Sequence, residues 1–104
     1  MKVYISLPIT GHDLAEVRLR AEEAKQFLTG MGYEPVSPLD VSPDPDAPYH
    51  EHIGRDIAAL LTCDAVLFLD GWKASRGCNL EMEAALIYKK EILFEYQLKN
   101  ERNV

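Results

Sequence analysis

The sequence lacks an excess of positive charge, a cysteine framework and a long apolar run. Lys and Arg number 11 against 17 Asp and Glu, so the 104-residue chain has a formal net charge of −6. This balance disfavours binding along a nucleic-acid backbone, which depends on clustered Lys and Arg. Cys63 and Cys78 are too few for a disulfide framework and lack metal-site spacing. No apolar run is long enough for a membrane span, and no secretory signal pattern is present. We therefore expect a cytoplasmic protein that binds no membrane, nucleic-acid polymer or metal.

Two common nucleotide-binding signatures are also absent. The chain has neither a G-x-G-x-x-G fingerprint nor a P-loop, so dinucleotide binding and ATP hydrolysis have no support. His12, His50 and His52 form no metal-ligand spacing with a carboxylate. The chain does have a large apolar share, 47%, which indicates one globular domain over residues 1–104.

Short apolar runs alternate with helical periodicities along the chain. The predicted strands are residues 2–7, 33–36, 64–69 and 91–94. The predicted helices are residues 12–30, 50–63 and 77–90, followed by a polar tail that can also be helical. This alternation predicts an α/β fold: a small single-domain parallel sheet of about four strands, flavodoxin- or Rossmann-like, with flanking helices and right-handed crossovers. The most apolar run, 64–69, is expected to be central, whereas Pro35 indicates an edge position or a strand end.

Residues 37–49 are rich in proline and aspartate, which predicts a loop without a helix. A loop this long in a small domain is often a lid or a binding element, but it can equally be an ordinary surface excursion. The sequence leaves both interpretations open.

The stretch from Asp70 to Glu83 follows the most apolar run and leads into the last predicted helix. In open parallel sheets, ligands bind beyond the carboxyl ends of the strands. The loop from Pro8 to Gly11 follows the first predicted strand and should lie at the same edge. The two loops therefore predict one site between them. Within the first stretch, Trp72 either stacks on a base or sugar or covers the edge of the core.

The carboxylates near this edge are the candidates for chemistry. Glu81 and Glu83 are two residues apart on a helix and point about 200° from each other, so only one can face the site. Periodicity favours Glu81, and the alternative is a favourable interaction with the helix dipole. Asp56 lies on the inner side of its helix and needs either a role or a salt bridge with Arg55 or a neighbouring helix. Asp70, at the carboxyl end of a strand, is placed for ligand contact.

Taken in order, these segments resemble the nucleoside 2-deoxyribosyltransferase-like superfamily, in particular its short DUF4406 members. The resemblance covers most of residues 2–94. The segments that carry it are Tyr4-Ile5-Ser6-Leu7-Pro8-Ile9-Thr10-Gly11, Arg55-Asp56, Asp64-Ala65-Val66, Gly71-Trp72, Ser75-Arg76-Gly77 and Glu81.

The resemblance implies a role for each matching position. Glu81 matches the nucleophile, Asp56 an active-site aspartate near the sugar and leaving group, and Ser75 a contact to the sugar 5′ end or a 5′-phosphate. The expected substrate-binding residues are Tyr4, Ser6, Pro8, Thr10, Gly11, Asp70, Trp72, Ser75 and Gly77. Two positions depart from the family pattern: Ser6-Leu7 stands where Ala-Gly or Cys-Gly is typical, and Thr10 where nucleotide-preferring relatives often carry Arg.

The implied reaction is cleavage or transfer at the N-glycosidic bond of a small nucleoside or nucleotide, through a covalent glycosyl-enzyme and without a cofactor. Under this interpretation we also expect a homo-oligomer, a dimer or tetramer, because the short tail and the single small sheet leave the cleft open on one side. The resemblance implies that a tail residue of a neighbouring subunit completes the site, and Asn100 or Asn103 would serve if the tail folds back. The main alternative is a non-catalytic nucleotide or sugar-nucleotide binding module, in which Glu81 would point to solvent beside Lys89 or Lys90. A third possibility is a structural partner that only oligomerises.

Overall fold

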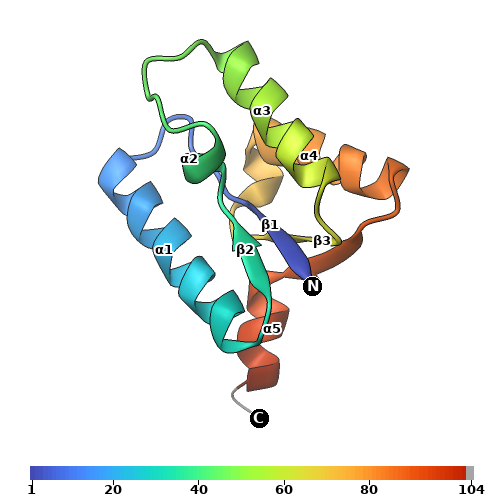
Figure 1. Ribbon diagram of the computed structural model, residues 1–104. Coiled ribbons are helices and arrows are strands. Elements are labelled where there is room, and N and C mark those ends of the chain that lie inside the picture. The colour runs from blue at the N-terminus through green and yellow to red at the C-terminus, as the bar shows by residue number, and fades with distance from the viewer. Residues whose placement is uncertain (103–104) are drawn as a thin grey trace.

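The computed structural model describes residues 1–102, with side chains for residues 1–100. Its four strands form one sheet in the order β2-β1-β3-β4, and every neighbouring pair is parallel. The strands are β1 (Lys2–Ser6), β2 (Glu34–Val36), β3 (Ala65–Phe68) and β4 (Glu91–Phe94). The predicted parallel α/β sheet is confirmed (Figure 1), with the apolar β3 inside and β2, which contains Pro35, at an edge.

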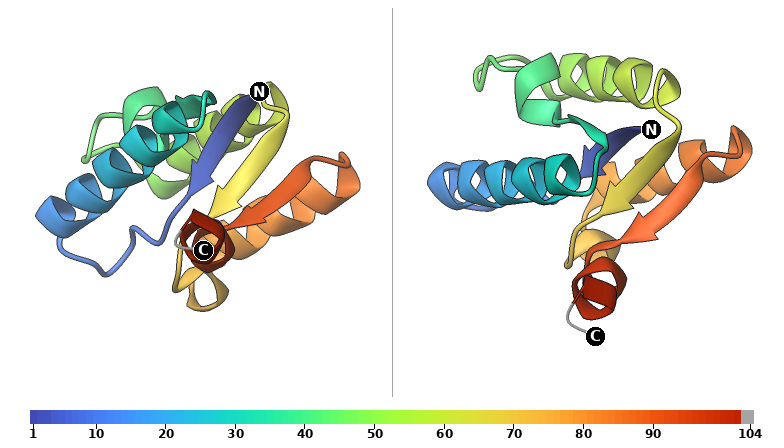
Figure 2. Two further views of the ribbon diagram at one scale, coloured as in Figure 1. Left: turned by 90° about the horizontal axis from the view of Figure 1, so that it is seen from below. Right: turned by 60° about the horizontal axis from the view of Figure 1, so that its bottom comes forward.

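Helices cover both faces of this sheet (Figure 2). The longer helices are α1 (Leu14–Gly30), α3 (Tyr49–Leu61), α4 (Arg76–Ile87) and α5 (Glu95–Arg102), and the short ones are α2 (Pro38–Val41) and η1 (Trp72–Ala74). Val3 and Ile5 pack with α1 and with Leu98 of α5. Tyr4 and its neighbours Val66 and Phe68 on β3 face the other way, toward α3 and α4. Because successive strand residues alternate between faces, β1 is buried on both sides.

The prediction of a loop without a helix over residues 37–49 is wrong, because α2 occupies its first part. The Ser37 hydroxyl accepts a hydrogen bond from the backbone N–H of Leu39, at 3.2 Å, and so caps the helix. Pro38 stands at the helix start, where the missing N–H costs nothing. Elsewhere the predicted elements exist, with ends that differ by at most three residues, and the tail is helical as α5.

The loops after β1 and β3 meet at the carboxyl edge of the sheet. Ser6 and Phe68 are paired at the ends of these strands. Gly71 has φ +91°, in the left-handed region that favours glycine, and a Cβ built there would lie 3.6 Å from Cγ of Pro8. Pro8 and Gly71 therefore lie side by side where the two loops meet.

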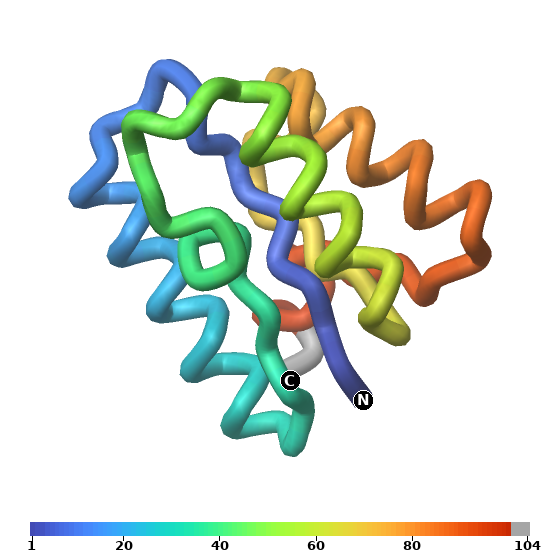
Figure 3. Tube along the Cα trace, turned by 45° about the horizontal axis from the view of Figure 1, so that its top comes forward, coloured from blue at the N-terminus to red at the C-terminus, as the bar shows by residue number. Residues whose placement is uncertain are grey.

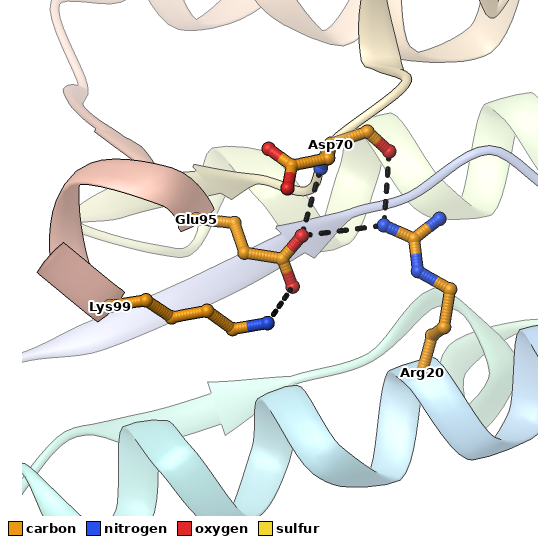
Figure 4. A network of polar contacts seen from close by, with 4 residues as sticks. All are labelled: Arg20, Asp70, Glu95 and Lys99. Atoms are coloured by element: carbon orange, nitrogen blue, oxygen red, sulfur yellow. Dashed lines mark hydrogen bonds and ion pairs between the residues drawn. The ribbon is translucent and has the colours of Figure 1, made fainter.

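A polar network fixes Asp70 at the end of β3 (Figure 4). Its backbone N–H donates to Oε1 of Glu95 at 3.0 Å, and its carbonyl accepts from Arg20 at 3.0 Å. Arg20 and Lys99 also form ion pairs with Glu95, at 3.4 Å and 3.3 Å. The network joins α1, the loop after β3 and α5. Among the described helices, none combines the length and the apolar character that crossing a membrane requires.

Candidate active site

A cavity of about 830 Å³ opens at the carboxyl edge of the sheet. This volume lies within the range of about 300–1,000 Å³ that is typical of small-molecule sites. One wall comes from α1, through Leu14, Arg18 and Ala21, and another comes from the segment between α2 and α3. Figure 3 shows this segment arching from α2 to the start of α3. Because its residues Pro43 and Pro45 line the cavity, the long loop is part of the pocket wall rather than a remote surface excursion.

Glu81 enters the cavity from α4 and is only 4% exposed. The Tyr4 hydroxyl donates to its Oε2 at 2.5 Å, and the Ser6 hydroxyl donates to its Oε1 at 2.8 Å. Both donors come from the same face of β1, because they are two residues apart on a strand. Glu83 is exposed. The structure therefore aims Glu81, and not Glu83, at the cavity.

Ser75 fixes where the helix of Glu81 begins. Its side chain accepts a hydrogen bond from the backbone N–H of Cys78 at 3.3 Å and caps α4. Gly77, in the first turn, lies close to Ile53 and Tyr49, since a Cβ there would lie 3.5 Å and 3.7 Å from their side-chain atoms. The helix start thus presents a small, polar surface to the cavity.

Asp56 reaches the same cavity from α3 and is 7% exposed. Its Oδ1 is buried and has no hydrogen-bond partner among the described residues. Arg55 does not pair with it: the guanidinium lies 3.5 Å from Glu51 and donates to Ser42 at 3.3 Å. The structure therefore does not show the alternative in which Asp56 forms a salt bridge with Arg55. A buried carboxyl without a partner is costly unless it has a role or a proton.

Burial changes the acidity of both carboxyls. Burial raises the pKa of Asp56 from 3.8 to about 7. Burial also raises the pKa of Glu81 from 4.5 to about 7, while the hydrogen bonds from Tyr4 and Ser6 oppose the rise and the nearby Asp56 carboxylate adds to it. Burial and the charges of Glu81 and Asp56 raise the pKa of Tyr4 well above 10, so its hydroxyl remains a donor. Two perturbed carboxyls in one cavity are typical of a catalytic site.

The other residues predicted for the site divide into three groups. Those that line the cavity beside the two carboxyls are Tyr4, Thr10, Ser75 and Gly77. Ser6 is fully buried and contacts Glu81. Pro8, Gly11, Asp70 and Trp72 are not among the lining residues. Pro8 lies where the two loops meet, Asp70 is held by the network of Glu95 and Arg20, and Gly11, with φ +83°, lies in the turn before α1.

Trp72 covers the edge of the core. Its ring centroid lies 5.3 Å from that of Phe68 and 5.9 Å from that of Phe94. The Lys73 ammonium lies 5.8 Å from the centroid of its ring. These contacts fit the structural interpretation of Trp72 rather than stacking on a base.

The sequence analysis does not predict that α1 lines the cavity, nor that Ser42 and His52 do. Arg18 follows Leu14 by four positions, and His52 precedes Asp56 by four, a spacing that places each pair on one helix face. This helical spacing is the feature of the sequence from which Arg18 and His52 could be predicted to face the cavity. Among the described residues, no group of three His, Cys, Asp or Glu side chains is close enough to hold a metal ion.

The sequence of residues 1–94 matches the family described as "Domain of unknown function (DUF4406)". The chain belongs to this family. No curated protein matches this DUF4406 chain in sequence. The family match confirms the resemblance to the short DUF4406 members, and solved structures share the fold of this chain.

Three such structures are similar over most of this DUF4406 chain. A 2-deoxyribosyltransferase from Bacillus psychrosaccharolyticus superimposes with a TM-score of 0.69 at 19% identity, over 90% of this chain and 71% of that one. A Clostridium botulinum CMP N-glycosidase gives 0.63 at 19%, over 90% and 70%. A 2-desoxiribosyltransferase from Leishmania mexicana gives 0.69 at 18%, over 89% and 62%. At these identities, the likeness establishes a shared fold.

Proposed function

We propose that this domain cleaves or transfers at the N-glycosidic bond of a deoxynucleoside, a nucleoside or its 5′-monophosphate, with Glu81 as the nucleophile. The observation that carries the proposal is the buried Glu81 carboxyl, held by the Tyr4 and Ser6 hydroxyls in the cavity that Asp56 shares. The printed names of the similar structures, two deoxyribosyltransferases and a CMP N-glycosidase, support the reaction class.

The two carboxyls differ in what stabilises their charged forms. Glu81 accepts two hydrogen bonds from hydroxyls, which favour the carboxylate, whereas Oδ1 of Asp56 accepts none. Two neighbouring carboxylates repel each other, so one proton is retained by the pair. We assign that proton to Asp56 and the negative charge to Glu81. This assignment gives one nucleophile and one acid.

In the first step, a Glu81 oxygen forms a bond to the anomeric carbon while the carbon–nitrogen bond breaks through an oxocarbenium-like transition state. The electron pair of the broken bond goes to the base, and Asp56 donates its proton to a base nitrogen. In the second step, water or a second base attacks the anomeric carbon and gives its proton to the Asp56 carboxylate. Glu81 leaves as a carboxylate. Water makes the protein a hydrolase, and a second base makes it a transferase.

The start of α4 is the proposed place for the sugar 5′ end. Ser75 and Gly77 line the cavity there, and a helix start attracts anions through its free N–H groups and dipole. Thr10 also lines the cavity and offers a hydroxyl where nucleotide-preferring relatives often carry Arg. A 5′-hydroxyl and a 5′-phosphate are both tested below.

The binding-module alternative predicts a solvent-facing Glu81 beside Lys89 or Lys90. Glu81 is instead 4% exposed, and the Lys90 ammonium donates to the carbonyl of Leu61 at 3.1 Å. Burying a carboxyl that performs no reaction would cost stability without a benefit. The burial of Glu81 therefore supports the enzyme.

We also propose that the protein forms a homo-oligomer in the cytoplasm. The outer side of α4 and the residue after it expose large apolar side chains: Leu80 is 46% exposed, Leu86 56%, Ile87 67% and Tyr88 60%. Exposed apolar side chains that cluster in this way are typical of an interface. Asn100, proposed above to complete a neighbouring site, is exposed on α5, and Asn103 lies outside the described residues. Light scattering of the protein and of Ile87→Glu tests the assembly.

The experiment that tests the reaction is incubation with deoxynucleosides, nucleosides and their 5′-monophosphates, with and without a second free base. Chromatography follows the released base and the exchanged nucleoside. We expect activity in the wild type and in Glu83→Ala, the matched control on the exposed side of α4, and none in folded Glu81→Ala. Equal activity in Glu81→Ala would refute the nucleophile, and a folded but inactive wild type would refute the proposed reaction.

A further inference from the structure

Ser42, His52 and Arg55 form a polar cluster beside Asp56 that the proposed reaction does not use. Ser42 is 5% exposed at the end of α2, and its Oγ lies 2.5 Å from Nδ1 of His52. The Arg55 guanidinium donates to the same Oγ at 3.3 Å. The cluster ties the end of α2 to α3. It holds His52 by one ring nitrogen, and Nε2 has no hydrogen-bond partner among the described side chains.

His52 lies one helical turn before Asp56, and both side chains line the cavity. Residues four apart on a helix are neighbours on one face, with Cβ atoms about 5–6 Å apart. The adjacent wall is apolar and comes from Pro43, Pro45 and Ala47. A flat ring that is apolar on its faces and polar at its edge fits between such a wall and a single hydrogen-bonding group.

From this arrangement we infer that His52 binds the edge of the nucleobase and selects among bases, an inference that rests on the proposed reaction. A nucleophile displaces a leaving group from the opposite side, so the base departs on the side of the anomeric carbon away from the Glu81 oxygen. Asp56 must reach a nitrogen of that base to give it a proton. His52, one turn before Asp56 on the same helix face, then contacts another part of the edge of the base.

The contact between Ser42 and His52 bears on which ring nitrogen of His52 carries a proton. Arg55 donates to Oγ of Ser42, and we assign the Ser42 hydroxyl as the donor to Nδ1 of His52. Nδ1 is then an acceptor, and the ring proton lies on Nε2. His52 thus offers an N–H donor, which pairs with a ring nitrogen or a carbonyl oxygen of a base. In this arrangement Ser42 is a positioning residue and His52 a specificity residue.

The test compares His52→Ala with His50→Ala, a matched control because His50 is exposed on the same helix and does not line the cavity. Substrates are natural nucleosides or nucleotides and their deaza analogues, in which one ring nitrogen acceptor is replaced by carbon. A hydrogen-bonding site rejects an analogue that lacks the partner atom. We expect wild type and His50→Ala to disfavour at least one deaza analogue by about ten- to a hundred-fold in kcat/KM, the effect of one lost buried hydrogen bond.

In His52→Ala, kcat/KM for the natural substrate should fall to the level of that analogue, and the discrimination should disappear. Discrimination that is retained in folded His52→Ala against every analogue that the wild type disfavours would overturn the inference while leaving the reaction intact. A wild type inactive on the whole panel would overturn the proposed function instead. In that case calorimetric titration of free bases into wild type and His52→Ala still decides the inference, because equal affinities, or no binding at all, count against it.

The positioning role of Ser42 is tested by measuring which tautomer the His52 imidazole adopts. Nitrogen-15 NMR of the imidazole should show the proton on Nε2 in the wild type and in Ser42→Thr, which keeps the hydroxyl. Ser42→Ala should show a mixture of tautomers and weaker base discrimination. A proton on Nδ1 in the wild type would contradict the assigned donor.

Discussion

The Tyr4 hydroxyl donates a 2.5 Å hydrogen bond to Oε2 of Glu81 and links β1 to α4 across 77 positions of sequence. Ser6 donates to the other carboxyl oxygen at 2.8 Å. Together, these contacts hold the carboxyl in one orientation inside the protein. They also favour its charged form, because both partners are donors. Burial would otherwise keep Glu81 protonated, so the two hydroxyls supply what a nucleophile needs.

Tyr4→Phe should therefore lower activity and shift its pH dependence. The substitution keeps the ring but removes a donor to the carboxylate, so the pKa of Glu81 should rise above about 7. Because the reaction needs ionised Glu81, the acidic limb of the kcat/KM profile should move to higher pH. At neutral pH we expect a loss of about ten- to a hundred-fold, the effect of a hydrogen bond to a charged group. Profiles of wild type and variant measure the shift, and an unmoved acidic limb would contradict the assigned role.

Ser6→Ala is the companion variant. It removes the longer of the two contacts to the Glu81 carboxyl. We expect a shift of the acidic limb in the same direction and smaller than that of Tyr4→Phe. A larger shift in Ser6→Ala would show that the Ser6 contact, and not the shorter Tyr4 bond, controls the charge of Glu81.

The glycosyl-enzyme should be trapped on Glu81. When wild type is mixed with a reactive substrate and quenched in acid, mass spectrometry should show a fraction of the protein heavier by one glycosyl group. Peptide mapping should place it on Glu81. Glu81→Gln should show no adduct and a loss of activity of about a thousandfold or more, because the amide is a poor nucleophile. Glu83→Gln should keep the adduct, and an adduct on Glu83 would reassign the nucleophile.

The apolar pattern was sufficient to predict the sheet, because β3 is apolar throughout, β1 is mostly apolar, and both lie at its centre. The α2 helix was missed since it depends on one local contact, the capping of Leu39 by Ser37, within a proline-rich stretch. A four-residue helix has too few positions to show a period. Short elements stabilised by a single cap are therefore poorly visible in sequence.

Helical spacing in the sequence predicts only some of the side chains that face the cavity. Helical spacing favoured Glu81 over Glu83, and the structure agrees, because only one face of α4 packs on the sheet. Spacing could not show that β1 supplies hydroxyl donors to Glu81, since those contacts join residues 75 and 77 positions apart. Nor could it show whether Trp72 faces a ligand or the core, which depends on where Phe94 lies.

Glu95→Gln should destabilise the fold without abolishing the reaction. Burial raises the pKa of Glu95, but the Asp70 N–H, Lys99 and Arg20 lower it by more, and the net direction is down. Stability from such a group is present above its ordinary pKa of 4.5 and is lost as pH falls through the lowered value. At pH 7 we expect a loss of about 1–3 kcal/mol in the free energy of unfolding.

Chemical denaturation at pH 7 and at low pH measures the difference between Glu95→Gln and wild type. It should shrink at low pH, where both side chains are neutral. Glu91→Gln, an exposed glutamate on β4, is the matched control and should change stability little. An equal loss in both variants would show that the network in Figure 4 does not stabilise the protein.

Asp56→Asn should stabilise the protein while it slows the reaction. The pKa of Asp56 is raised from 3.8 to about 7, so between these values the folded state keeps a proton that the unfolded chain releases. The unfolded state therefore binds fewer protons, and the stability of the wild type falls as pH rises from about 4 to 7. The cost reaches at most about 4 kcal/mol, at about 1.4 kcal/mol for each unit of pKa. Asparagine has no charge to bury and avoids this cost.

Denaturation of wild type and Asp56→Asn from pH 4 to 8 tests this linkage, with the exposed Asp46→Asn as control. The advantage of Asp56→Asn should be absent near pH 4, grow toward pH 7 and stay constant above it. Its activity should fall, because asparagine has no acidic proton for the leaving base. If Asp56→Asn is no more stable than wild type at pH 8, Asp56 has a partner in solution. If it is stabilised but fully active, the proton comes from another group, and the unpaired carboxyl has no part in the reaction.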